Sequence, residues 1–159
     1  MPASSPRRTA GVIAPPPTIP LAVVLVAEAM RWWYPLPLRL APVGWRWALC
    51  VGCLVAALAL IGAAVLTLRR ARTPVEPWKP TRAIVDTGPY ALSRNPIYVG
   101  FLALQLSYAW GRANGWALVL LPLTIGVLQW GVIGREERYL RERFGEPYRT
   151  YAARVRRWL

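Results

Sequence analysis

The sequence contains no histidine, only two cysteines and only seven acidic residues among 159. Without histidine, the chain lacks the side chain that most often acts as a general base at neutral pH. It can form neither a histidine metal site nor a Ser-His or Cys-His nucleophile. We therefore expect no bound metal, and the composition disfavours most hydrolases.

The two cysteines, Cys50 and Cys53, form a CxxC motif inside a long apolar run. Such a pair can be a redox or zinc motif, but no second pair is present to complete a zinc site. In an apolar helix the same spacing places two small, weakly polar side chains one turn apart. We interpret this pair as structural.

The scarcity of acids leaves a net charge of +13, although 55% of the residues are hydrophobic. Charged and apolar residues are segregated into blocks, which is typical of a membrane protein with basic ends. The Trp/Arg clusters at 31–33 and 45–47 flank apolar runs, as interfacial belts do. We therefore expect the lipid bilayer as a partner and no nucleic acid.

The apolar runs predict an all-α membrane protein with about four transmembrane helices. They cover residues 19–34, 47–68, 94–112 and 116–134. The first is short, and the last two are joined by the turn GRANG into a helical hairpin. Residues 1–18 are rich in Pro, Ser and Arg and predict a disordered cytoplasmic N-terminus, followed by a single domain over 19–159.

The distribution of positive charge predicts the orientation. With four spans, sixteen of the twenty Lys and Arg residues lie on one side, in the N-terminus, the 69–94 loop and the tail after residue 134. The other side holds only Arg31, Arg39, Arg46 and Arg112. By the positive-inside rule, we expect a multi-pass protein with both termini cytoplasmic, and the short-looped, Arg- and Ala-rich style indicates a bacterial plasma membrane.

The tail predicts a helix, a break and a second helix, both amphipathic and cytoplasmic. Residues 134–144 form the first helix, Gly145 ends it, and Pro147 suits the first turn of the next. In the second helix, Tyr148, Tyr151 and Val155 share one face. The opposite face carries Arg149, Arg156 and Arg157. The basic face suits anionic lipid, while the tyrosine face suits a lid over a cytoplasmic pocket.

Two polar clusters fall at the expected cytoplasmic border. At Arg94-Asn95-Pro96, the Asn is a favourable N-cap and the Pro suits the first helical position. The helix N-terminus and Arg94 would attract a carboxylate or phosphate, although a well-capped helix with an interfacial Arg is the alternative.

The second cluster is Glu136-Glu137, whose adjacent carboxylates repel each other and are costly to bury. Neighbouring helical positions point about 100° apart, so one Glu can face the bundle while the other meets Arg141 or lipid. The alternative is a solvated tail neutralised by Arg135 and Arg138. Farther up the chain, Glu28 is either an acceptor-side group or the i,i+3 partner of Arg31, and we favour the ion pair.

These clusters resemble a known family. Residues 93–100, SRNPIYVG, are similar to the R-(H/N)-P-x-Y-x-G signature of membrane-embedded methyltransferases. Residues 136–155 resemble the family's E-E-x-x-L-x-x-x-F-G-x-x-Y-x-x-Y-x-x-x-V pattern. The family includes isoprenylcysteine carboxyl methyltransferase and phosphatidylethanolamine N-methyltransferase, and the resemblance covers about residues 79–157.

The resemblance implies S-adenosylmethionine as cofactor, bound between two walls. One wall comprises Gly88, Tyr90, Arg94, Asn95, Pro96, Tyr98 and Gly100, and the other comprises Glu136, Glu137, Tyr148 and Tyr151. Arg94, Tyr98 and Glu137 are implied in catalysis. Within this frame we expect the cofactor's carboxylate at Arg94, its ammonium at one of the two Glu and its sulfonium on the Tyr98 ring.

The methyl acceptor that the resemblance implies is lipophilic and enters from the bilayer. A prenylated-peptide carboxylate, a phospholipid amine and a small apolar metabolite all remain open. A sterol-reductase-like enzyme using NADPH is an alternative, because those reductases carry a related R-x-P-x-Y-x-G segment. A non-catalytic membrane scaffold is the other alternative.

Overall fold

The computed structural model describes residues 10–38 and 42–159, which form helices and connecting loops with no strand among them. In chain order the elements are α1 (Thr18–Trp33), α2 (Val43–Arg70), the 3-10 helix η1 (Gly88–Ala91), α3 (Pro96–Arg112), α4 (Gly115–Val119), α5 (Leu121–Leu128), the π-helical turn η2 (Gln129–Ile133), α6 (Gly134–Phe144) and α7 (Glu146–Arg154). The all-α prediction is confirmed.

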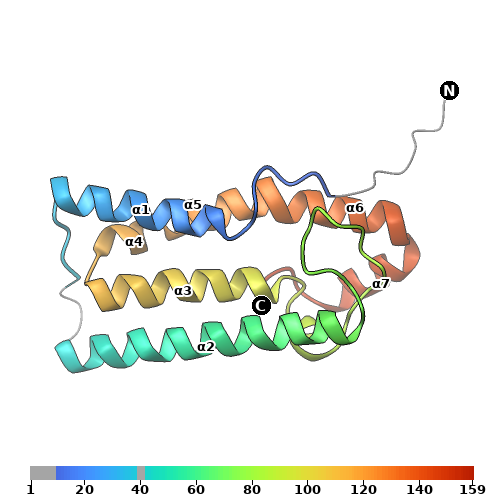
Figure 1. Ribbon diagram of the computed structural model, residues 1–159, viewed down its shortest axis with the longest axis horizontal. Coiled ribbons are helices and arrows are strands. Elements are labelled where there is room, and N and C mark those ends of the chain that lie inside the picture. The colour runs from blue at the N-terminus through green and yellow to red at the C-terminus, as the bar shows by residue number, and fades with distance from the viewer. Residues whose placement is uncertain (1–9, 39–41) are drawn as a thin grey trace.

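The helices lie side by side along one long axis (Figure 1). α2 packs mainly on α3, while α1 packs on α4 and α5. The four elements α4, α5, η2 and α6 follow one another as a single interrupted rod. The α2–α3 loop and α7 gather at one end of the molecule, and the α1–α2 connection and the α3–α4 turn lie at the other.

Two of these helices are long and apolar enough to cross a membrane: α2 and the rod Gly115–Phe144. α1 and α3 have 16 and 17 residues. At about 1.5 Å per residue they reach roughly 24–26 Å, which is less than the ~30 Å hydrocarbon core. The four-span arrangement therefore stays a prediction beyond these two candidates.

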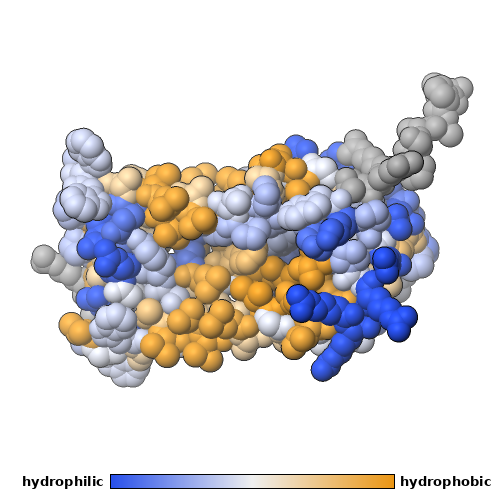
Figure 2. All heavy atoms as spheres, in the orientation of Figure 1, coloured by the Kyte–Doolittle hydropathy of each residue, from blue (hydrophilic) through white to orange (hydrophobic). Residues whose placement is uncertain are grey.

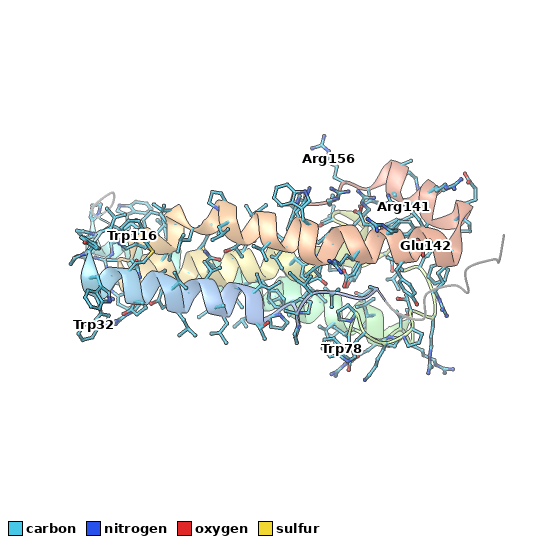
Figure 3. All side chains as sticks on the ribbon, turned by 90° about the horizontal axis from the view of Figure 1, so that it is seen from above. Trp32, Trp78, Trp116, Arg141, Glu142 and Arg156 are labelled. Atoms are coloured by element: carbon cyan, nitrogen blue, oxygen red, sulfur yellow. The ribbon has the colours of Figure 1, made fainter. Side chains whose placement is uncertain are left out.

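The distribution of apolar and hydrophilic side chains on the surface is the one expected of a helical bundle in a lipid bilayer. Apolar side chains cover the middle of the molecule and hydrophilic ones collect at its two ends (Figure 2). Large exposed apolar residues are concentrated on α1 and α2 and include Leu21, Leu25, Val51, Val55 and Leu58. Trp32 and Trp116 lie at one end, and Trp78, Arg141 and Arg156 at the other (Figure 3). This banding is the pattern of a bilayer-embedded protein with interfacial aromatics.

Small residues permit α2 and α3 to approach closely. Ala57 and Ala64 of α2 are fully buried. A Cβ added at Gly100 of α3 would overlap the Ile61 side chain of α2. Nearby, Cys50 Sγ lies 3.5 Å from a serine hydroxyl of α3, and both cysteines are free thiols.

A polar corner joins α1, α3 and α4 at the end away from α7. Glu28 pairs with Arg31 at 3.1 Å and with Arg112 at 3.0 Å, so the expected i,i+3 ion pair is confirmed. The Tyr108 hydroxyl and the Asn114 amide also donate to this carboxylate. Glu28 is thus held by groups from three elements. Arg39, expected at the same end, lies outside the described residues.

The rod Gly115–Phe144 is interrupted twice, once between α4 and α5 and once at η2. Pro122, which has no backbone N–H, follows the α4–α5 break, and the amide of Gln105 donates to the buried Ala117 carbonyl at 2.9 Å. Gln105 also accepts a 2.8 Å hydrogen bond from Thr124. The second interruption is η2, whose π-helical turn inserts an extra residue immediately before α6 and so changes the facing of every later side chain.

The N-terminal segment lies against this turn. Residues 1–9 of the predicted disordered stretch fall outside the described residues. Beyond them, Ile13 N donates to Gly131 O at 3.3 Å, and Arg135 donates to Gly11 O at 2.9 Å. These contacts place the start of the described chain beside α6.

Candidate functional site

The first wall of the site is the beginning of α3. Pro96 opens the helix and Asn95 occupies its N-cap position, as the sequence predicts. The Asn95 side chain, however, makes no capping hydrogen bond, and its amide donates instead to Arg157 O at 2.8 Å. The expected side-chain cap is therefore wrong, and the Asn95 side chain is held instead by this tertiary contact.

The second wall is α6, where the two adjacent glutamates have different partners. Glu137 is 2% exposed and lies in a cluster of cations. Arg157 binds its carboxylate through two hydrogen bonds of 3.0 and 2.7 Å, and Arg94 approaches to 3.2 Å. Arg141, the partner expected from i,i+4 spacing, is 3.9 Å away. Glu137 is thus neutralised mainly by residues distant in sequence.

Glu136 has no cationic partner among the residues that the structure describes. Its carboxylate accepts a 2.7 Å hydrogen bond from the Tyr98 hydroxyl of α3. It lies in α6, beyond the apolar part of the rod. Burial raises the pKa of Glu136 to about 7, the Tyr98 hydrogen bond opposes part of that rise, and the negative charge of Glu137 adds to it. This side chain is therefore a half-buried acid that lacks a counter-ion among the described residues.

The alternative of a solvated Glu pair neutralised by Arg135 and Arg138 does not match the structure. Arg135 binds the Gly11 carbonyl, and Arg138 is exposed and forms no ion pair with either Glu. The two carboxylates instead serve different structural purposes. One is the centre of an ion-pair cluster, and the other faces inward.

The tail closes over these walls, and its helix is shorter than expected. Tyr148, Tyr151 and Val155 form one buried cluster, as predicted. The Tyr151 hydroxyl donates to Tyr90 O at 2.8 Å, which ties α7 to η1. α7 ends at Arg154, so the prediction that Arg156 and Arg157 extend its basic face is wrong. The chain becomes extended at Val155, and this turns Arg157 inward to Glu137.

A pocket lies between the two walls and under the α2–α3 loop. Its space, counting the open solvent at its mouth, is about 900 Å³. Nine of the eleven predicted site residues line it: Tyr90, Arg94, Asn95, Pro96, Tyr98, Glu136, Glu137, Tyr148 and Tyr151.

The remaining two predicted residues, Gly88 and Gly100, lie outside this lining. Gly100 faces Ile61 in the α2–α3 contact. Gly88 has a φ of +58°, a conformation that favours glycine, and starts η1 near Thr67. Gly100 therefore permits the close approach of α2 and α3, and Gly88 permits the turn that begins η1.

Sequence reasoning missed several residues of the pocket. Several loop residues between Thr73 and Val85 contribute, and Ala10, Leu68, Ile97, Tyr139 and Leu140 complete the lining. The Tyr139 hydroxyl accepts from Thr81 N at 3.2 Å, which fastens the loop to α6. Because the loop has no periodic pattern, its sequence carried no signal beyond its richness in proline.

Arg94 carries a polar group left unused by the fold. Its guanidinium pairs with Glu137, but its Nε is buried and has no hydrogen-bond partner. A buried donor without a partner costs about 1–3 kcal/mol, so a bound acceptor at this position would stabilise it. The pocket thus offers one donor from Arg94, one acid at Glu136 and several tyrosine rings. Among the described residues, no group of three or more His, Cys, Asp or Glu side chains gathers as metal ligands would.

Comparisons with known proteins identify the family of this chain. No solved structure matches the chain significantly. An uncharacterized protein of Haemophilus influenzae is 36% identical over 63 residues, which make up 40% of this chain and the whole of that protein. The profile of the phospholipid methyltransferase family matches residues 45–147, well over half of the chain and both walls of the pocket. The chain therefore belongs to the phospholipid methyltransferase family.

Proposed function

We propose that this protein is an integral membrane methyltransferase that uses S-adenosylmethionine to methylate a lipophilic acceptor. The pocket between α3, α6 and α7 is the proposed cofactor site. The observation that carries the proposal is Glu136, a half-buried acid that borders this pocket and has no counter-ion among the described residues. Family membership supports methyl transfer as the reaction.

The residues present suit this cofactor's charges. S-adenosylmethionine supplies an activated methyl group on a positively charged sulfonium and also carries an ammonium and a carboxylate. Glu136 would hold the ammonium, because it is the acid of the pocket wall that has no cation of its own. The unpaired Nε of Arg94 would donate to the carboxylate. The rings of Tyr90, Tyr98 and Tyr148 offer electron-rich faces to a cation.

This assignment changes the role that we first expected for Glu137. Its carboxylate already binds Arg157 and Arg94 and is almost completely buried. An additional ammonium there would have to displace one of these cations. We therefore propose Glu136 as the ligand-binding acid and Glu137 as the group that orients Arg94.

Catalysis also requires that the methyl donor and the acceptor are aligned in a pocket from which water is excluded. α7 covers the pocket with Tyr148 and Tyr151, both buried. Excluding water and fixing the two reactants accounts for much of the rate enhancement in such a displacement. A carboxylate acceptor needs no base and an amine needs only a weak one, so the lack of histidine is compatible with either.

We also propose that α1 and α3 cross the membrane together with the two longer helices, with both termini cytoplasmic. The exposed apolar band and the cation-rich end beside the pocket support this topology. The acceptor would then approach from the bilayer while the soluble cofactor enters from the cytoplasm.

The test is calorimetric titration of the detergent-purified protein with S-adenosylmethionine, S-adenosylhomocysteine and NADPH. We expect micromolar binding of the first two, lost in Glu136→Gln. Glu142→Gln is the matched control, because Glu142 lies on the same helix with an exposed side chain at the end of the molecule (Figure 3). Binding equal in both variants would refute the role of Glu136.

The same titration distinguishes the alternatives. NADPH binding alone would favour a reductase, although an unpaired acid in the wall is unfavourable for a polyanionic cofactor. If the folded protein binds none of these three ligands, a non-catalytic scaffold is favoured. Once cofactor binding is established, transfer of labelled methyl groups to prenylated peptides, phospholipids or extracted membrane lipids would identify the acceptor.

A further inference from the structure

The last five residues, Val155–Leu159, form a strap that runs from α7 back to the start of α3. Its backbone is extended at Val155, with φ −112° and ψ 132°. Arg94 N donates to the Arg156 carbonyl at 2.9 Å, and the Asn95 amide donates to the Arg157 carbonyl at 2.8 Å. The strap therefore accepts hydrogen bonds from two adjacent residues of the first pocket wall.

The far end of the strap is hydrogen-bonded to the rod Gly115–Phe144. Trp158 Nε1 donates to Gln129 Oε1 at 2.9 Å, and Gln129 begins the π-helical turn that precedes α6. The strap thus links the two walls of the pocket, although it lies outside the residues matched by the family profile.

The Arg157 side chain is the strap's contact with the acids. Its Nε and Nη2 bind the two oxygens of Glu137 at 3.0 and 2.7 Å. Two parallel hydrogen bonds from a planar guanidinium fix both the charge and the orientation of a carboxylate. Without this fork, Glu137 would keep Arg94 at 3.2 Å and the distant Arg141.

We propose that Arg157 is a positioning residue: it neutralises and orients Glu137 so that Glu136 can act as the anionic group of the pocket. This inference rests on the proposed cofactor site. Two adjacent carboxylates cannot both remain charged at low cost unless one is paired. The groups that face Glu136 are Tyr98 of α3, Tyr90 of η1 and Glu137 on α6 itself.

The matched pair of variants is Arg157→Gln and Arg156→Gln. Both remove one positive charge from neighbouring positions of the strap and leave its backbone carbonyls in place. The Arg156 side chain is exposed and points away from the ribbon (Figure 3), so it serves as the control. A difference between the variants therefore reports the Arg157–Glu137 contact rather than net charge.

The first measurement needs no cofactor. Because burial raises the pKa of Glu136 to about 7 in the folded state, protonation favours folding, and this stability is lost as the pH rises from about 4 through 7. We measure thermal unfolding of the cofactor-free protein in detergent from pH 5 to pH 9. Arg157→Gln should move the end of this decline upward by about 0.5–1 pH unit, since Glu137 then repels Glu136 more strongly. Arg156→Gln should leave it in place.

The second measurement is affinity for S-adenosylhomocysteine at pH 7. At pH 7, an upward shift of 0.5–1 unit from a pKa of about 7 lowers the ionised fraction of Glu136 about twofold to fivefold, and we expect a loss of affinity of that size for Arg157→Gln. Arg156→Gln should stay within about twofold of the wild type. Restored affinity in Arg157→Gln at higher pH would support the positioning role, because a merely damaged fold would not recover.

Arg157→Lys keeps the inference testable if the Gln variant does not fold. Lysine retains the charge but not the planar fork, so it should retain the wild-type pH profile and lose less affinity than Gln. Identical pH profiles and affinities for the residue 157 and residue 156 variants would overturn the inference. If the wild type binds no cofactor, the proposed function fails, and the cofactor-free pH profile still decides the role of Arg157.

Discussion

The hydroxyl of Tyr98 donates a 2.7 Å hydrogen bond to the carboxylate of Glu136. This contact joins the first turn of α3 to the first turn of α6, and both residues line the same pocket. It directly links the two sequence segments that resemble the methyltransferase signatures. It also supplies the hydrogen bond that holds the Glu136 pKa below the value burial alone would produce.

Replacing Tyr98 by Phe removes this hydrogen bond while keeping the ring. The Glu136 pKa should rise further, so that less of the acid is ionised at pH 7. We expect S-adenosylhomocysteine affinity to fall about threefold to tenfold at pH 7 and to recover at pH 9, measured by calorimetry. Tyr34→Phe is the control, because Tyr34 is 74% exposed at the opposite end. An unchanged affinity in Tyr98→Phe would remove Glu136 from the cofactor site.

Cofactor affinity of the wild-type protein should itself depend on pH. Glu136 must be ionised to bind an ammonium, and its pKa is about 7. Affinity should therefore increase about tenfold between pH 6 and pH 8 and then level off. Titrations across this range, corrected for buffer ionisation, measure the effect. In Glu136→Gln the remaining weak binding should be flat over the same interval, and a persistent slope would assign it to another group.

Gly100→Ala should destabilise the protein without acting on the pocket. The new Cβ would overlap Ile61 of α2, and overpacking of this kind costs about 1–3 kcal/mol. Thermal unfolding in detergent should show the loss, and Ile61→Ala in the same chain should restore part of it. Gly52→Ala is the control, because nothing lies within 4 Å of a Cβ added there. A selective loss of cofactor binding with normal stability would return Gly100 to the binding site.

Glu28→Gln should weaken the far corner of the bundle and leave cofactor binding intact. The substitution removes a charge that pairs with Arg31 and Arg112. Loss of such charged hydrogen bonds costs about 1–2 kcal/mol of unfolding free energy. Thermal unfolding and calorimetry on the same sample separate the two effects. Normal stability combined with impaired methyl transfer would instead support the acceptor-side role that the sequence left open.

Much of the fold was predictable because local rules govern it. Pro96 begins α3 and Gly145 ends α6, since proline suits a first helical turn and glycine tolerates a positive φ. The tyrosine face of α7 followed from helical periodicity and is confirmed by the cluster of Tyr148, Tyr151 and Val155. The four-span topology rests on charge and length, and within residues 10–38 and 42–159 two helices are long and apolar enough to cross a membrane.

The partners within the site were less predictable. Periodicity favoured Arg141 as the partner of Glu137, but Arg157 lies closer. That contact needs α7 to stop at Arg154 and the next residues to turn inward, which no repeating pattern in a five-residue tail indicates. The individual residues between Thr73 and Val85 that line the pocket were not singled out either, because the α2–α3 loop has no periodic pattern.

The sequence by itself determined an all-helical, basic-ended membrane protein and the two segments that meet at one end. Apolar runs, charge blocks and helix-end residues are local properties, so they can be read without a fold. Only the tertiary structure decided which of the two pocket-lining acids is paired with cations. The π-helical turn at Gln129–Ile133 rotates α6 relative to a continuous helix, and long-range contacts from Tyr98 and Arg157 then give Glu136 and Glu137 their separate roles.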